Sequence, residues 1–247
     1  MTVIVVSGTG TEIGKTVTTA AVAALALAAG HSVAVLKPAQ TGVVPGEPGD
    51  AEEVTRLAGD GITTLELARF PEPLAPNTAA RRAGMAPVRP YEVAEAAQKL
   101  AAGHDLVLVE GAGGLLVRYD DEGATLADAA RLLTAPVLVV TPAGLGTLNT
   151  TALTAEALRA RGLEPLGVTI GSWPTAPDLA ARCNLADLPQ AAGAPLLGAV
   201  PQGAGALAPG DFRTRAGAWL GPELGGAWDA AAFTARETAG ARETPGL

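Results

Sequence analysis

Short apolar runs alternate with longer helix-like stretches along the chain. The runs are rich in Val, Leu and Ile and carry few polar positions, which is typical of parallel strands that helices cover on both faces. We predict strands at residues 3–7, 32–37, 105–110, 136–141, 165–170 and 196–200. Helices are predicted at residues 15–29, 51–58, 91–102, 126–133, 148–161 and 177–185. This alternation predicts an α/β fold with a mostly parallel, doubly wound sheet.

A glycine-rich segment, SGTGTEIGKT at residues 7–16, joins the first predicted strand to the first helix. Glycines allow successive N–H groups to converge on phosphate oxygens, and the helix start adds unpaired N–H groups and a positive dipole end. Lys15 would reach the terminal phosphates and the Thr16 hydroxyl would bind Mg²⁺. The alternative is an ordinary glycine-rich turn, but Gly-Lys-Thr in a strand–loop–helix setting favours a P-loop NTPase-type sheet.

This loop departs from the usual phosphate-binding pattern. Five residues separate Gly8 from Gly14, where the common pattern has four. No lysine precedes Lys15, whereas partition-type and septum-positioning ATPases carry an extra lysine early in the loop. The loop is therefore a variant, and that branch of the superfamily loses support.

Lysines are scarce, which makes their positions informative. The chain has 17 basic residues, and lysine occurs only at positions 15, 37 and 99. Lys99 lies on a polar helix face and is expected in solvent. Lys37 ends an apolar strand, at the sheet edge where open α/β folds bind ligands. A strand-end lysine can simply reach solvent, but beside a phosphate loop we favour a role in the site because a compact ammonium suits a tight phosphate cradle.

Two carboxylates occupy positions suited to a metal–phosphate site. Glu110 ends a strand and is followed by Gly111-Ala112-Gly113-Gly114, so it can hold Mg²⁺ while the backbone approaches phosphate. The alternative, a strand-end charge in water, fits poorly with the glycines behind it. Asp50 precedes a predicted helix and could be its N-cap, a metal ligand, or both.

Composition excludes several classes of protein. The 247 residues carry a formal charge of −8 and 3% aromatic residues, which argues against a nucleic-acid surface or a base-stacking platform. A single cysteine excludes an intrachain disulfide. The first residues lack the basic region of a signal peptide, and the longest apolar run is too short to cross a membrane, so we expect a cytoplasmic location.

Two segments fall outside the alternating pattern. Residues 70–90 contain five prolines and are expected to form a long excursion, as a lid or a wall over the site. Near the end, ARETAG is followed by ARETPG, a polar repeat too short to build a solenoid. We predict one synthetase domain over residues 1–234 and a disordered tail over 235–247.

These motifs together resemble the ATP-dependent dethiobiotin synthetases of biotin biosynthesis. The resemblance covers about residues 3–203 in order and spacing, and it rests on GTGTEIGKT (8–16), KPAQTG (37–42), GDA (49–51), VEGAGG (109–114) and GLGTLN (144–149). The longer phosphate loop is itself a trait of that family. Gly10 stands where the family loop often has an acidic residue, and Thr41 replaces a common serine but keeps the hydroxyl.

The resemblance implies a ring closure driven by ATP. 7,8-Diaminononanoate takes up CO₂ (supplied as CO₂ or bicarbonate) as a carbamate, whose oxygen attacks the γ-phosphate, and the second amine then closes a cyclic urea. The implied catalytic residues are Lys15 and Lys37, and the implied Mg²⁺ ligands are Thr16, Asp50 and Glu110. The implied substrate contacts are Thr11, Lys37, Thr41, Gly146, Thr147 and Asn149, the last three receiving the tail carboxylate at a helix start across a homodimer interface; Thr147 could equally be a plain N-cap. The implied nucleotide contacts are Glu12, Ile13, Gly14, Lys15, Thr16, Val17, Asp50, Glu110, Gly111, Ala112, Gly113, Gly171, Ser172, Pro201, Gln202 and Gly203.

One departure concerns the base of the nucleotide. Family members commonly place an Asn-containing segment after the strand at 165–170 to read adenine, whereas this chain has Gly171-Ser172-Trp173-Pro174. Two other functions remain open. One is a different P-loop amide-forming synthetase such as a cobyrinate amidating enzyme, whose glutamine-hydrolysing domain has no room here. The other is a non-enzymatic nucleotide switch, disfavoured by the missing early lysine.

Overall fold

The computed structural model describes residues 2–239. Within them, seven strands form one parallel sheet in the order β3-β2-β4-β1-β5-β6-β7. The strands are β1 (Thr2–Gly8), β2 (Val33–Thr41), β3 (Ile62–Phe70), β4 (Leu106–Gly114), β5 (Val137–Thr141), β6 (Pro165–Trp173) and β7 (Leu196–Pro201). The predicted fold class, a P-loop NTPase-type parallel sheet with helices on both faces, is confirmed.

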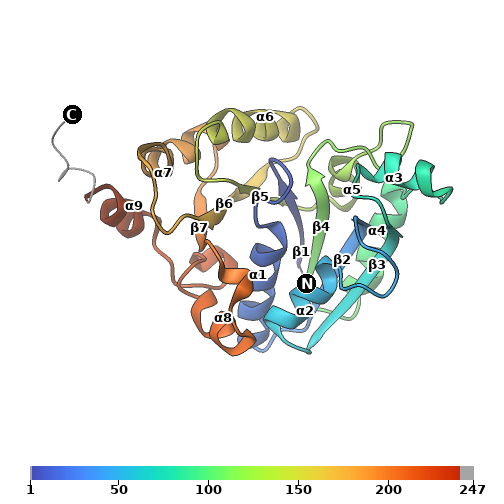
Figure 1. Ribbon diagram of the computed structural model, residues 1–247, viewed down its shortest axis with the longest axis horizontal. Helices are drawn as coiled ribbons and strands as arrows, with labels where there is room; N and C mark the ends of the chain where they lie inside the picture. The colour runs from blue at the N-terminus through green and yellow to red at the C-terminus, as the bar shows by residue number, and fades with distance from the viewer. Residues whose placement is uncertain (1, 240–247) are drawn as a thin grey trace.

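Helices cover both faces of this sheet (Figure 1). They are α1 (Lys15–Ala28), α2 (Asp50–Ala58), α3 (Pro76–Ala83), α4 (Pro90–Ala101), α5 (Leu126–Leu133), α6 (Thr147–Arg159), α7 (Leu179–Ala192), α8 (Pro209–Ala216) and α9 (Ala230–Ala239). Two short 3₁₀ helices, Ala204–Ala206 and Pro222–Leu224, flank α8. No helix within residues 2–239 combines the length and apolar character that crossing a bilayer requires.

Side chains that alternate between the two faces of the sheet form two hydrophobic cores, one under each layer of helices. In β1, Val5 packs with α4 and α5, whereas its neighbours Ile4 and Val6 pack with α1, α2 and α8. Successive strand side chains point to opposite faces, so an unbroken apolar strand feeds both layers. A third cluster joins β6 and β7 to α7 and α9.

Several predicted boundaries were wrong for identifiable reasons. β3, α3 and α8 have no counterpart among the predicted elements, and α3 lies inside the proline-rich excursion at 70–90. β2 continues past Pro38 to Thr41, which is tolerated because β4 pairs with β2 only as far as Leu36 and the missing Pro38 N–H interrupts no inner ladder. The helix predicted at 177–185 is α7, which runs to Ala192 and accommodates Pro189.

The predicted tail also begins too early. α9 includes residues 235–239, where we had expected disorder, because Phe233 anchors the helix against Trp173 and Trp228. Arg236 lies 4.8 Å from the centre of the Phe233 ring and extends this contact. The rest of the predicted tail, residues 240–247, lies outside the described residues.

The carboxyl ends of β1, β2 and β4 meet near the middle of the sheet. β1 lies between β4 and β5, and the chain leaves it toward β2 on one side before returning to β5 on the other. Ligands of open α/β sheets bind outside the carboxyl ends of strands at such a reversal. The fold therefore places the phosphate loop, Lys37 and Glu110 at one edge.

Candidate active site

The glycine-rich loop forms a tight turn between β1 and α1. Gly14 has a φ of 91° and Glu12 a φ of 57°, so both adopt the left-handed conformation. A Cβ on Gly14 would lie 2.1 Å from the carbonyl oxygen of Gly171, so no other residue fits between the loop and β6. The loop thus packs directly against β6, and its N–H groups lie at the start of α1.

Lys15 is folded into this loop. Its side chain is buried, and Nζ donates a hydrogen bond to the Gly10 carbonyl at 3.1 Å. Burial and the neighbouring positive charge of Lys37 lower the pKa of Lys15, against the weaker attraction of Glu110 and Asp50. An anionic phosphate in the loop would supply the counter-charge that favours the protonated form.

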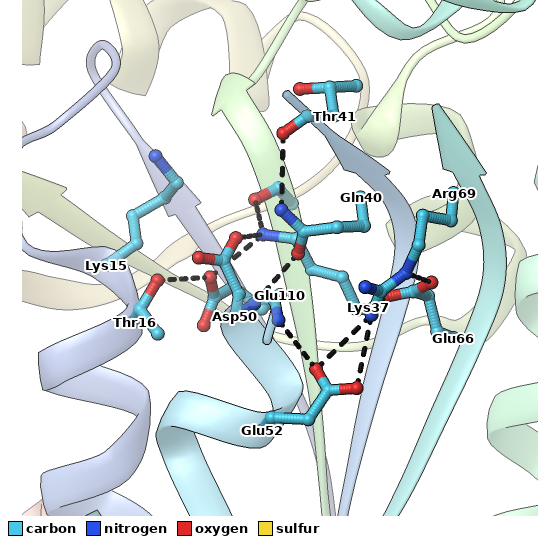
Figure 2. Close-up of polar contacts among 12 residues, drawn as sticks. Lys15, Thr16, Lys37, Gln40, Thr41, Asp50, Glu52, Glu66, Arg69 and Glu110 are labelled. Carbon is cyan, nitrogen blue, oxygen red and sulfur yellow. Dashed lines mark hydrogen bonds and ion pairs between the residues drawn. The ribbon is translucent and has the colours of Figure 1, made fainter. Parts of the chain in front are cut away.

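Lys37 lies at the centre of a buried charge cluster (Figure 2). Its Nζ donates to Glu110 Oε1 at 2.9 Å, to the Gly111 carbonyl at 3.2 Å, and forms an ion pair with Asp50. The Thr16 hydroxyl donates to the same Glu110 oxygen at 2.9 Å. Four elements, α1, β2, α2 and β4, therefore bring one ammonium, one hydroxyl and two carboxylates into contact.

The electrostatics of this cluster favour the charged forms of Lys37 and Asp50. Burial alone would lower the pKa of Lys37, but Glu110 and Asp50 outweigh burial and raise it. Burial alone would likewise raise the pKa of Asp50, but Lys37 outweighs burial and lowers it. Lys37 is therefore an ammonium and Asp50 a carboxylate at neutral pH.

The structure corrects the capping alternative for Asp50. Gly49 is the N-cap of α2, and Asp50 is its first helical residue. The Gly49 N–H donates to Glu52 Oε2 at 2.9 Å, so the carboxylate of Asp50 is not needed to cap the helix. It points instead toward Lys37 (Figure 2).

A cavity of about 780 Å³ opens above this cluster. The predicted residues that line it are Thr11, Glu12, Ile13, Gly14, Lys15, Thr16, Val17, Lys37, Thr41, Asp50, Ala112 and Gly113. Glu110 is almost fully buried beneath the cavity, and Gly111 follows it on β4. The central part of the predicted site is thus brought together.

Part of the cavity wall was missed from the sequence. Ala39, Gln40, Gly42, Pro73, Leu74, Ala75, Pro76 and Val117 line the cavity without having been assigned a role. The prolines of residues 70–90 had indicated a wall or lid, and Pro73–Pro76 do form a wall. Gln40 belongs to the KPAQTG motif but had no role assigned to it, and nothing in the sequence pattern indicated Val117.

The predicted nucleotide contacts Gly171, Ser172, Pro201, Gln202 and Gly203 lie outside the cavity lining. Gly171 packs its backbone against the loop, where a Cβ would lie 2.0 Å from the Ile13 carbonyl oxygen. Ser172 is exposed, and the Gln202 N–H donates to the Trp173 carbonyl at 2.7 Å. Pro201 ends β7, and Gly203 precedes the 3₁₀ helix at Ala204–Ala206.

The residues predicted to hold the substrate tail also lie outside this cavity. Gly146 is the N-cap of α6 and Asn149 is exposed. The Thr147 side chain is buried, and its hydroxyl lies 2.6 Å from that of Thr141. The Thr147 hydroxyl therefore faces Thr141 in this structure, and the alternative of Thr147 as N-cap is wrong because Gly146 is the N-cap.

Comparison with known proteins identifies the family. A family model described as an AAA domain matches residues 2–207. An ATP-dependent dethiobiotin synthetase of Streptomyces avermitilis is 73% identical, over 94% of this chain and 98% of the relative. Those of Streptomyces coelicolor and Saccharopolyspora erythraea are 72% and 68% identical, over 94% and 92% of this chain and 98% and 99% of the relatives. The chain belongs to the ATP-dependent dethiobiotin synthetase family.

Solved structures support the fold of this family member. Chloroplast FtsY from Physcomitrella patens has a TM-score of 0.56 at 17% identity, over 96% of this chain and 65% of that one. The MinD cell division protein of Aquifex aeolicus has a TM-score of 0.54 at 13% identity, over 100% and 99% of the two chains. The family recognised from sequence, and with it the assignment as an ATP-dependent ligase, is confirmed.

Proposed function

We propose that this pocket carries out the ring closure of 7,8-diaminononanoate with CO₂ to dethiobiotin, with ATP and Mg²⁺. The observation that carries the proposal is the convergence of Lys15, Thr16, Lys37, Asp50 and Glu110 around one phosphate loop. Phosphoryl transfer is catalysed mainly by positioning and by positive charge around the transferring group. Two buried ammonium groups beside the loop supply that charge.

The donor set fits Mg²⁺. Glu110 Oε2 is buried and has no hydrogen-bond partner among residues 2–239, so this oxygen is available for a cation. Thr16 and Asp50 add a hydroxyl and a carboxylate, and Mg²⁺ is commonly held by one or two carboxylates together with substrate phosphates. Residues 2–239 contain no cluster of three or more His, Cys, Asp and Glu able to bind a metal without such help. Bound Mg²⁺ would neutralise charge developing on the phosphates.

The chemistry proceeds in three steps. One amine attacks CO₂, loses a proton and becomes a carbamate. A carbamate oxygen attacks the γ-phosphorus and ADP leaves, which gives a carbamic–phosphoric anhydride. The second amine then attacks the carbonyl carbon, loses a proton and expels phosphate. Lys37 and Lys15 would hold the negative oxygens of the carbamate and the γ-phosphoryl group through these steps.

The cavity wall suits the rest of the substrate. The Thr11 and Thr41 hydroxyls line the cavity and would accept or donate hydrogen bonds at the diamine. Pro73, Leu74 and Val117 give the cavity an apolar side that would contact the aliphatic chain. Glu12, Ile13, Gly14, Val17, Gly111, Ala112 and Gly113 would surround the triphosphate, and Gly171, Ser172, Pro201, Gln202 and Gly203 would flank the base.

A second copy of the chain would complete the substrate site. Leu145, Leu153 and Leu116 are 89%, 57% and 44% exposed, and Leu116 and Leu153 line one groove between β4 and α6. Exposed apolar side chains of this kind favour a homodimer interface. The start of α6, with Gly146 and Asn149, adjoins this groove and would receive the tail carboxylate of a substrate bound to the partner.

Oxygen transfer tests the mechanism. With C¹⁸O₂ in short incubations, the carbamate oxygen that attacks phosphorus leaves with the phosphate, so we expect one ¹⁸O in the released phosphate. Phosphate without ¹⁸O, formed together with dethiobiotin, would exclude the anhydride.

Sedimentation equilibrium tests the dimer. Leu153→Glu places a charge in the proposed interface, so we expect a shift toward monomer and a raised KM for the diamine. Leu132→Glu, at a comparably exposed leucine on α5, is the control and should change neither. A monomeric wild-type chain with full activity would contradict a shared site.

A further inference from the structure

Gln40 is a buried side chain of the cavity wall that the reaction described above does not use. It lies on β2 between Lys37 and Thr41 and is 5% exposed. Its side-chain carbonyl Oε1 accepts the backbone N–H of Asp50 at 2.9 Å, and its Nε2 donates to the Thr41 carbonyl at 3.3 Å (Figure 2). One amide therefore connects β2 to the start of α2.

The hydrogen bond from the Asp50 N–H to Gln40 pairs a backbone donor at the start of α2. The first N–H groups of an α-helix have no acceptor within the helix, and a buried one must find a partner elsewhere. Here a strand side chain supplies that acceptor to the residue whose carboxylate pairs with Lys37. Gln40 therefore holds one backbone group of the residue whose carboxylate pairs with Lys37.

The surroundings leave the turn before α2 little freedom. Arg69 lies opposite Gln40 in the β2–β3 register and donates to Glu66 at 2.7 and 2.9 Å and to Glu52 at 3.1 Å. Glu52 in turn accepts the Gly49 N–H. A Cβ on Gly49 would lie 2.9 Å from Gln40 Oε1 and 3.1 Å from an Arg69 nitrogen, so a side chain at position 49 would displace the ends of these two side chains.

We propose that Gln40 is a positioning residue, which holds the Asp50 carboxylate as a Mg²⁺ ligand by accepting the Asp50 backbone N–H. The inference rests on the proposed function, which makes Asp50 a metal ligand. Partners that orient metal ligands without touching the metal are typically worth about 10-fold to 100-fold in metal affinity.

Two substitutions distinguish the effect of the Gln40 acceptor oxygen from the effect of the rest of the side chain. Gln40→Met keeps the length of the side chain and removes both polar ends, whereas Gln40→Glu keeps an acceptor oxygen. Gln98→Met, the same change at an exposed position of α4, is the control for the substitution itself. All are made in the full chain. The first readout is Mn²⁺ affinity by electron paramagnetic resonance with a non-hydrolysable ATP analogue. The second is hydrogen exchange of the Asp50 amide without nucleotide.

We expect Gln40→Met to weaken Mn²⁺ binding about tenfold or more and to speed exchange of the Asp50 amide. Gln40→Glu should keep the protection and should not weaken Mn²⁺ binding, since its extra negative charge attracts the cation. Gln98→Met should match the wild-type chain. If Gln40→Met does not fold, Gly49→Ala crowds the same Gln40 oxygen and should lower Mn²⁺ affinity in the same direction.

Equal Mn²⁺ affinity in the wild-type chain and Gln40→Met would overturn the inference. So would a raised KM for the diamine with unchanged Mn²⁺ affinity, which would make Gln40 a substrate contact. Failure of the wild-type chain to bind Mn²⁺ with nucleotide would instead overturn the proposed function, so the two failures are distinguishable.

Discussion

Lys15 and Lys37 differ in the direction of their pKa shifts and in the charged groups that surround them. Lys37 is 3% exposed and touches two carboxylates, which raise its pKa against the effect of burial. Lys15 is buried beside Lys37 and its pKa is lowered. A triphosphate in the loop would give Lys15 its missing counter-charge. The Lys37 ammonium therefore has negatively charged partners with or without substrate, whereas the Lys15 ammonium gains a negatively charged partner when the triphosphate binds.

Lys15→Ala tests the residue that the triphosphate would engage. Removing a charge that stabilises the transition state costs about 2–4 kcal/mol, so we expect kcat/KM to fall by about 30-fold to 1,000-fold. Thermal stability should change little, because Lys15 Nζ donates only to the Gly10 carbonyl among the contacts of the described residues. Turnover like that of the wild-type chain would exclude this loop as the phosphate site.

Asp50→Asn tests the carboxylate as a metal ligand. Asn keeps the backbone N–H that Gln40 accepts, and Gly49 still caps α2, so the helix start should remain. Lys37 keeps its bond to Glu110, so we expect a small loss of stability and about a tenfold rise in the Mg²⁺ concentration for half-maximal rate. Glu53→Gln, in the same helical turn but paired with Arg56 at the surface, is the control. Unchanged Mg²⁺ dependence in Asp50→Asn would remove Asp50 from the metal site.

At the scale of single elements, predictability followed the strength of the local signal. The glycine-rich loop and the apolar inner strands were predicted because their patterns are continuous and specific. β3 was not, since it lies at the edge of the sheet and its residues Thr63 and Thr64 are exposed. α9 was not, because Phe233 packs against Trp173 of the distant strand β6 as well as against the neighbouring Trp228. Local sequence carries no signal for contacts of that kind.

Thr147 shows the same limit at the start of α6. Its hydroxyl belongs to a buried chain in which Thr141 lies 3.2 Å from Thr9, 2.6 Å from Thr147 and 2.9 Å from Thr151. This series of threonine hydroxyls joins the phosphate loop, the end of β5 and the first turns of α6. A sequence motif at a helix start could not reveal that its threonine points inward.

Thr147→Val tests this assignment. Valine keeps the shape but leaves buried hydroxyls without a partner, so we expect a loss of about 1–2 kcal/mol, or roughly 2–8 °C in Tm. The KM for the diamine should stay unchanged. Asn149→Ala, at an exposed position of the same helix turn, should raise that KM without lowering Tm. A raised KM and a normal Tm in Thr147→Val would restore Thr147 as a substrate contact.

At the scale of the whole molecule, the parallel sheet brings distant motifs to one edge. Residues of β1, β2 and β4 are far apart in sequence, yet their carboxyl ends meet because adjacent parallel strands end at the same side. The placement of Lys37 and Glu110 near the phosphate loop could therefore be predicted from strand ends. The outer walls could be predicted only in part, because the prolines of residues 70–90 indicated a wall or lid, whereas Val117 comes from a loop whose course no strand pattern fixes.

The base side of the nucleotide leads to a further prediction. Gly171 packs on the phosphate loop, and Ser172 is exposed beside it. A site that lacks buried polar groups for a base discriminates weakly, so we expect ATP, GTP and CTP to differ in kcat/KM by well under about 10⁴-fold. The comparison is made with the diamine saturating. A preference for ATP of about 10⁴-fold or more would show that other residues read adenine.

The central claim is that this chain couples ATP cleavage to closure of a cyclic urea. The most direct test is to incubate the purified full chain with 7,8-diaminononanoate, ¹³C-bicarbonate and MgATP, and to measure dethiobiotin by mass spectrometry together with ADP. We predict a product carrying one ¹³C, formed in equal amount to ADP and absent when any one component is left out. ADP formed without the labelled product, or product formed without ATP, would contradict the account.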